Sequence, residues 1–158
     1  MREEYTEAYL SLGSNLGDRE RCLEDAVSRL NEEIGAVFAR SSFYETEPWG
    51  FDSEHLFLNM AVGVKTLLDP FKVLDACKRI EREMGRLQSG KEGYDDRPID
   101  IDLLFYGERV IKEETLEVPH PKLHLRRFVL EPLSEIAPRL AHPKSGKTIE
   151  ELKNNIND

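Results

Sequence analysis

The spacing of apolar residues predicts four strands and two helices in the first two thirds of the chain. Apolar positions alternate in the segments expected to be strands, and they recur every three to four residues in the segments between them. The strands are expected over residues 8–12, 36–46, 56–66 and 98–105. The helices are expected from about Asp18 to Gly35 and from Asp69 to Gly85, with Asp69 as the cap of the second helix and a glycine at the end of each.

The order β-α-β-β-α-β predicts a ferredoxin-like α+β plait, in which both helices cover one face of a mostly antiparallel sheet. A C-terminal extension follows, with short extended pieces around 109–118, turns around His120 and a final helix from about Thr148. A length of 158 residues suits one domain, so a single domain over 1–158 is expected. This fold serves many functions, so the function must be argued from particular residues.

The fourth strand carries two acidic residues at strand spacing. Asp100 and Asp102 are expected on one face, and the opposite face is expected to carry Ile99, Ile101, Leu103 and Phe105. Carboxylates two residues apart are separated by about 6.6 Å along a strand. Magnesium in phosphate-binding sites takes one or two carboxylates together with phosphate oxygens and water. The pair therefore favours a magnesium–polyphosphate site over the alternative, a polar strand face exposed to solvent.

Basic residues lie close to this strand in sequence, although the chain as a whole is acidic. Its formal net charge of −9 disfavours nucleic acid as a partner. Arg86 and Arg97 precede the two aspartates, and Arg126 follows His120, which stands between two prolines. One guanidinium group can donate two parallel hydrogen bonds to phosphate oxygens, so these arginines are candidates for phosphate contacts. The alternative is that each is an ordinary surface residue.

Three further residues suit a flat heterocyclic ligand. Phe57 and Asn59 share one face of the third strand, and Phe128 follows the histidine turn. Two aromatic rings can hold a heterocycle between them, while an amide supplies a donor and an acceptor for its edge. Packing in the core is the alternative for the rings, but an amide within a strand needs specific partners.

No apolar run reaches the length of a membrane span, so membrane insertion is not expected. The first seven residues are polar and acidic, unlike a secretory signal or a transit peptide. A cytoplasmic protein is therefore expected.

Several motifs occur together in one order, and as a set they are specific. They are LGSNLGD at 12–18, SFYETEPWG at 42–50, FLNMA at 57–61, IEREMGR at 80–86, RPIDID at 97–102, VPHP at 118–121, RRFVL at 126–130 and PLSEIAP at 132–138. In this order and spacing the chain resembles the 6-hydroxymethyl-7,8-dihydropterin pyrophosphokinase family over about residues 8–140.

The resemblance implies roles for the residues at matching positions. Asp100 and Asp102 would bind two Mg²⁺ ions, and Arg86 and Arg97 would steady the phosphates during transfer. The ATP site would be formed by Glu81, Arg86, Arg97, His120 and Arg126. The pterin site would be formed by Thr46, Pro48, Trp49, Phe57, Asn59 and Phe128.

The resemblance also implies the reaction. Pyrophosphate would pass from ATP to 6-hydroxymethyl-7,8-dihydropterin in folate biosynthesis, with AMP as the second product and a monomer as the working form. The loop over 88–96 would close over ATP. Two other classes remain open from the residues alone: a sensor that binds pterin or nucleotide without turnover, and a phosphohydrolase that uses the two aspartates.

Overall fold

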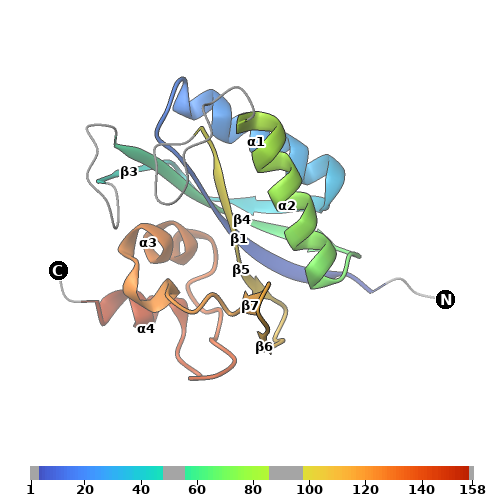
Figure 1. The fold of residues 1–158 in the computed structure, drawn as a ribbon. Coiled ribbons are helices and arrows are strands. Elements are labelled where there is room, and N and C mark those ends of the chain that lie inside the picture. The colour runs from blue at the N-terminus through green and yellow to red at the C-terminus, as the bar shows by residue number, and fades with distance from the viewer. Residues whose placement is uncertain (1–3, 48–55, 86–97, 157–158) are drawn as a thin grey trace.

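The computed structural model describes residues 4–47, 56–85 and 98–156, and these form one sheet, a short hairpin and four α-helices (Figure 1). The elements in chain order are β1 (Thr6–Ser14), α1 (Arg19–Glu33), β2 (Gly35–Arg40), β3 (Tyr44–Thr46), β4 (Phe57–Thr66), α2 (Pro70–Gly85), β5 (Asp100–Tyr106), β6 (Ile111–Lys112), β7 (Glu117–Val118), the 3₁₀ turn η1 (Leu123–Leu125), α3 (Arg127–Ile136) and α4 (Ile149–Asn154). Among the described residues, no helix is long and apolar enough to cross a membrane.

The main sheet has the strand order β2-β4-β1-β5, and β3 pairs with the first residues of β4. Each of these pairs is antiparallel. With α1 after β1 and α2 after β4, this is the predicted ferredoxin-like arrangement, so the predicted fold class is confirmed. The strand expected over 36–46 is divided into β2 and β3.

Both helices begin after an aspartate cap, which was predicted for Asp69. The Asp18 side chain accepts a hydrogen bond from the Arg21 amide at the start of α1. Asp69 does the same for the amides of Phe71 and Lys72 at the start of α2. These caps satisfy amide groups that have no partner within the first helical turn.

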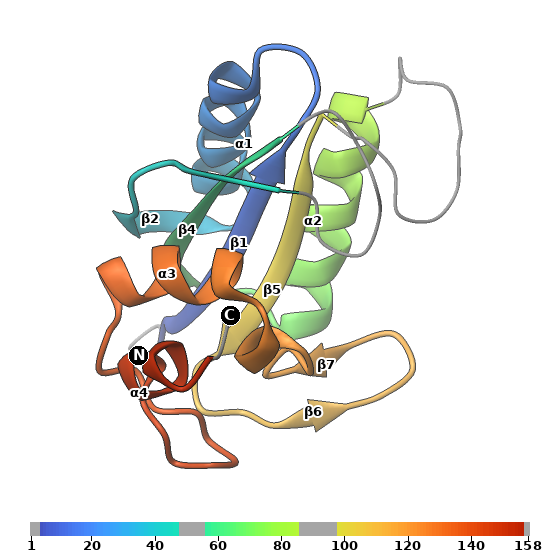
Figure 2. The same ribbon diagram turned by 90° about the vertical axis from the view of Figure 1, so that its left-hand side faces the viewer.

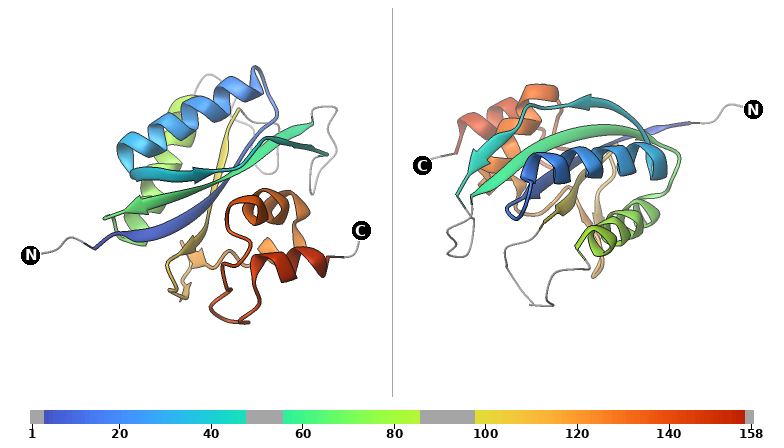
Figure 3. Two further views of the ribbon diagram at one scale, coloured as in Figure 1. Left: turned by 180° about the vertical axis from the view of Figure 1, so that it is seen from behind. Right: turned by 90° about the horizontal axis from the view of Figure 1, so that it is seen from above.

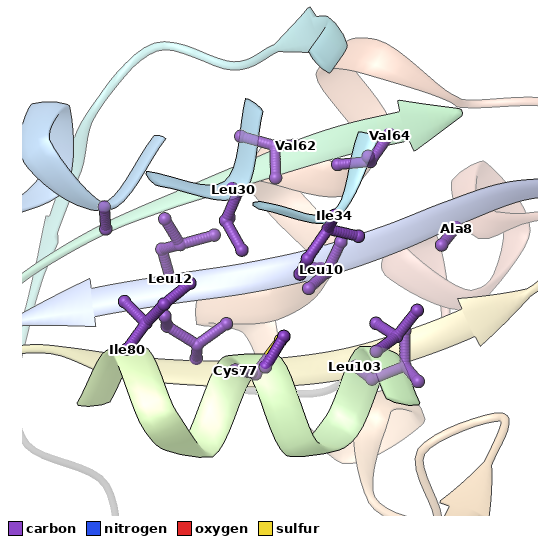
Figure 4. Close-up of a cluster of buried hydrophobic side chains, with 14 of the residues drawn as sticks. Ala8, Leu10, Leu12, Leu30, Ile34, Val62, Val64, Cys77, Ile80 and Leu103 are labelled. Atoms are coloured by element: carbon purple, nitrogen blue, oxygen red, sulfur yellow. The ribbon is translucent and has the colours of Figure 1, made fainter. Parts of the chain in front are cut away.

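One apolar core lies between the sheet and the helices α1 and α2. Figure 4 shows Leu10 and Leu12 of β1 in this core, with Leu30 of α1 and with Cys77 and Ile80 of α2. Leu30, Leu10, Leu12 and Ile80 are fully buried. Their burial follows from the predicted alternation in the strands and the apolar stripe on each helix.

A second core covers the opposite face of the sheet. Tyr9, Ala61, Leu104 and Phe105 pack there against residues of α3 and α4. Figures 1 and 3 show these two helices across the sheet from α1 and α2. The expectation of helices on one face therefore holds only for α1 and α2. α3, which contains Pro132 in its interior, was not predicted from the sequence.

One residue of β5 was assigned to the wrong face. Tyr9 pairs with Phe105 but Leu10 pairs with Leu103, so Leu104 is an extra residue in the ladder. A β-bulge of this kind reverses the alternation beyond it. Phe105 consequently lies in the second core with Leu104, rather than beside Ile101 and Leu103 in the first. Figure 2 shows the β6–β7 hairpin beyond this end of β5.

Candidate active site

The strand register brings the predicted metal and pterin residues into one row across the sheet. Asp100 pairs with Gly13 on β1, and Gly13 pairs in turn with Asn59 on β4. Adjacent strands are about 4.8 Å apart, so Asp100 and Asn59 lie about 10 Å apart across the sheet. Asp102 pairs with Ser11 in the neighbouring row, one step along the same face. The alternation places this row on the face that carries α3 and α4.

The Asn59 side chain is held by the short strand β3. Its Nδ2 atom donates to the Thr46 hydroxyl at 2.6 Å and to the Tyr44 carbonyl oxygen at 3.3 Å. A carbonyl oxygen can only accept, so these bonds fix which end of the amide faces β3. The amide oxygen Oδ1 is left facing away from β3, toward Gly13. Asn59 is only 3% exposed, which makes this arrangement rigid.

Gly13 leaves the space that Asn59 and Phe57 occupy. A Cβ atom at this position would lie 3.0 Å from the Asn59 Oδ1 atom and 3.4 Å from the Phe57 Cδ1 atom. Asn59 and Phe57 therefore lie on one face, as the sequence predicted. The first strand was expected to end at Leu12, whereas β1 continues to Ser14 and includes Gly13.

The two aspartates of β5 are half-buried, and Ile101 between them faces the first core. Two carboxylates on one strand face are a donor set that suits Mg²⁺, which takes its remaining ligands from phosphate and water oxygens. Within the described ranges, no group of three or more His, Cys, Asp or Glu side chains is arranged to hold a metal ion. Asp100 and Asp102 would hold Mg²⁺ together with oxygen atoms of phosphate and water.

Glu81 of α2 reaches the edge of β5 between these aspartates. Its Oε2 atom accepts a hydrogen bond of 2.7 Å from the Ile101 amide. Burial raises the pKa of Glu81 to about 8, and the negative charges of Asp100 and Asp102 add to the effect. In the absence of a bound cation, the raised pKa favours the neutral carboxyl group, which can share a proton with Asp100. The structure places Glu81 against β5, and the predicted contact with ATP stays a prediction.

His120 lies beside β5, and the charge of Arg126 is close to its ring. The His120 amide donates to the Leu104 carbonyl oxygen at 3.0 Å, and its Nδ1 atom accepts from the Lys122 amide at 3.2 Å. Burial, together with the nearby Arg126 charge, lowers the pKa of His120 to about 4. The neutral ring therefore carries its proton on Nε2.

Arg126 is 8% exposed, and its guanidinium group lies 5.7 Å from the centre of the Phe128 ring. Phe128 packs against the second core from α3. The structure thus brings the predicted ATP residues His120 and Arg126 to the same side of the sheet as the predicted pterin residue Phe128.

Four predicted site residues lie outside the described ranges: Pro48, Trp49, Arg86 and Arg97. The predicted closing loop over 88–96 lies outside them too.

A model of the 7,8-dihydro-6-hydroxymethylpterin-pyrophosphokinase (HPPK) family matches residues 9–138. The chain belongs to this family. It is 48% identical over 139 residues to the 2-amino-4-hydroxy-6-hydroxymethyldihydropteridine pyrophosphokinase of Porphyromonas gingivalis, covering 87% of this chain and 94% of that protein. The Bacillus subtilis protein of the same name is 45% identical over 130 residues, covering 82% of this chain and 77% of that protein.

Solved structures support the HPPK fold. Wild-type HPPK-DHPS from Plasmodium falciparum matches with a TM-score of 0.77 at 19% identity, over 97% of this chain. The chain spans 45% of the length of that protein. The predicted family, fold class and pyrophosphokinase activity are confirmed by these comparisons. The roles of individual HPPK site residues stay predictions.

Proposed function

We propose that this chain transfers pyrophosphate from ATP to 6-hydroxymethyl-7,8-dihydropterin, giving AMP and the dihydropterin pyrophosphate in folate biosynthesis. The observation that carries the proposal is the row from Asp100 through Gly13 to Asn59. It places carboxylates suited to a metal–phosphate group and an amide suited to a heterocycle about 10 Å apart on one sheet face. Bringing two substrates together in this way is the main requirement of the reaction.

The pterin would occupy the Asn59 end of the row. With both amide hydrogens bonded to β3, Asn59 presents its oxygen as an acceptor for an N–H group on the pterin edge. Phe57 and Phe128 would stack on the two faces of the ring. Thr46, Pro48 and Trp49 would complete the recognition of the pterin edge.

The triphosphate would occupy the Asp100 end. Asp100 and Asp102 would hold two Mg²⁺ ions, which supply positive charge to the phosphate oxygens when bound. Arg86, Arg97 and Arg126 would contribute further charge. His120 is neutral at pH 7, so it would act as a hydrogen-bond donor through Nε2 rather than as a cation.

The chemical step would be a direct displacement at the β-phosphorus of ATP. The hydroxymethyl oxygen of the pterin forms a bond to this phosphorus, and the bond from the phosphorus to the oxygen of AMP breaks. The alcohol proton passes to water or a phosphate oxygen. Phosphoryl-type transfer depends mainly on alignment and charge, so the protein has to hold the two substrates in line and surround them with cations.

The test of the proposal is the identity of the products. Purified protein with ATP and Mg²⁺ should form AMP and dihydropterin pyrophosphate in equal amounts, and only when 6-hydroxymethyl-7,8-dihydropterin is present. Phosphate release without the pterin would favour the phosphohydrolase alternative. Binding of both ligands without AMP would favour a sensor. A single domain over 1–158, a monomeric state and a cytoplasmic location stay predictions.

A further inference from the structure

A cluster of polar side chains joins α3 to residues 42–44, at the start of β3. Glu135 of α3 accepts a hydrogen bond of 2.6 Å from the Tyr44 hydroxyl. It also accepts from the Ser42 amide, at 3.0 and 3.1 Å to its two oxygens, and from the Ser42 hydroxyl at 3.1 Å. Three donors from one short segment therefore meet one carboxylate more than 90 residues away in the chain.

The electrostatics of this cluster keep each group in the state that the bonds require. The hydrogen bond to Glu135 raises the pKa of Tyr44 to about 12. The same bond and those from Ser42 lower the pKa of Glu135. The phenol stays protonated and the carboxylate stays charged around neutral pH. Hydrogen bonds to a charged acceptor are stronger than those between neutral groups.

The strand attached to this cluster is short and is held by few contacts among the described residues, one of them an ion pair of 2.7 Å between Glu45 and Arg19. β3 is three residues long, and its ladder pairs it with β4. Just before it, the Ser41 hydroxyl accepts from the Ala61 amide, and the Ser41 amide donates to the Ala61 carbonyl oxygen, each at 2.9 Å. A strand this short depends on side-chain contacts to stay in place.

The position of β3 decides how Asn59 is presented. Tyr44 and Thr46 of β3 supply the two acceptors for the Asn59 amide hydrogens. If β3 moves away, the amide loses both partners and is free to rotate, so that its NH₂ group can face the ligand in place of its oxygen. A pterin edge that donates hydrogen bonds would then meet another donor, which is an unfavourable contact.

We propose that Glu135 is a positioning residue for pterin recognition, which acts through Ser42 and Tyr44 to keep the Asn59 amide oxygen directed at the substrate. The inference rests on the proposed function, because it takes the pterin as the ligand of Asn59. It assigns to α3 a role in substrate selection that goes beyond covering the sheet.

The test compares Glu135→Ala, Glu135→Gln and Tyr44→Phe with a matched control, Glu131→Ala. Glu131 lies one turn earlier on α3 and is paired with Arg127, so it reports any general effect of losing a glutamate there. Glu135→Ala is expected to raise the KM for the pterin about ten-fold, while the KM for ATP changes less than about two-fold. Glu135→Gln keeps an acceptor oxygen and should recover most of the loss. Tyr44→Phe should show a smaller rise, and Glu131→Ala none.

An unchanged pterin KM in folded Glu135→Ala, or an equal rise in the KM of both substrates, would overturn the proposal. If Glu135→Ala does not fold, Tyr44→Phe decides between the same outcomes, because it removes one hydroxyl only. If the wild-type protein forms no AMP, the proposed function fails separately. Calorimetric titration of 6-hydroxymethylpterin, with magnesium and α,β-methylene-ATP present, then decides the role of Glu135. Weaker pterin binding by Glu135→Ala than by Glu131→Ala supports it, and equal binding overturns it.

Discussion

The carboxylate of Glu81 accepts a hydrogen bond from the amide of Ile101, the residue between the two aspartates of β5. β5 is an edge strand at this point, and the amide faces away from the sheet toward α2. An edge amide that is buried without a partner is costly. Glu81 therefore satisfies the edge of β5 at the place where Asp100 and Asp102 have to be held at a fixed separation.

This relationship predicts different effects for two substitutions of Glu81. Glu81→Gln has the shape of the neutral glutamic acid and can accept from Ile101 while donating to Asp100. Glu81→Ala leaves the Ile101 amide without a partner and should lower the free energy of unfolding by about 1–3 kcal/mol. Urea unfolding at pH 7 in EDTA measures the free energy of unfolding of both variants. Equal destabilisation by the two variants would contradict the role given to the hydrogen bond.

The raised pKa of Glu81 also predicts how stability changes with pH. Its ordinary pKa is 4.5 and its folded-state pKa is about 8, so the unfolded state ionises first as the pH rises. In the wild type, the contribution of Glu81 to the free energy of unfolding is fully present below pH 4.5 and is lost as the pH rises toward 8. Glu81→Gln cannot ionise. In EDTA it should therefore gain stability relative to wild type between pH 5 and pH 8, and a constant difference over this range would contradict the assignment.

The lowered pKa of His120 predicts the opposite change of stability with pH. Its folded-state pKa of about 4 lies below its ordinary value of 6.5, so the unfolded state takes up a proton first as the pH falls. The contribution of His120 to the free energy of unfolding is fully present above pH 6.5 and is lost between pH 6.5 and pH 4. Because the ring is only half-buried, a loss of about 1 kcal/mol at pH 5 is expected. Urea unfolding should show this loss in wild type and not in His120→Gln.

Gly13 predicts an effect on substrate binding rather than on stability alone. In Gly13→Ala the new Cβ atom would lie 3.0 Å from the Asn59 Oδ1 atom, and this contact must be relieved by moving the amide. The KM for the pterin should rise about ten-fold with a smaller change in the KM for ATP, because the contact is confined to the Asn59 end of the row. The control for Gly13→Ala is a glycine-to-alanine change elsewhere, Gly85→Ala, because the new Cβ atom would make only an ordinary contact of 3.6 Å with Pro98. Gly17→Ala is unsuitable as a control, because Gly17 has a φ of +68° that disfavours alanine.

Local patterns were sufficient to predict most of the elements and their caps. Alternation predicted the strand over 56–66, and its residues Leu58, Met60, Val62 and Val64 lie together in the first core. Asp18 and Asp69 marked the helix starts because capping depends on the nearest few residues. Local patterns did not predict α3. Pro132 is a helix-breaking residue, and the turns before it suggested irregular structure.

Features that depend on long-range register could not be predicted in this way. The bulge at Leu104 arises from pairing between β1 and β5, which are far apart in sequence, and it changed the face of Phe105. The contact between Glu135 and Tyr44 depends on how α3 lies on the sheet. Strand spacing and motif resemblance predicted Asn59 and Asp100 as site residues, but their alignment across Gly13 appears only in the folded sheet.

The central claim, that the aspartates of β5 bind the magnesium used for transfer, is tested most directly by the rate of pterin-dependent AMP formation in Asp102→Asn. This variant keeps the size of the side chain and removes its charge. The rate should fall roughly 10³-fold at saturating Mg²⁺, with the unfolding midpoint close to that of wild type. Asp75→Asn, an exposed position on α2, serves as the control and should retain full activity. A rate for Asp102→Asn within a few-fold of the control would contradict the claim.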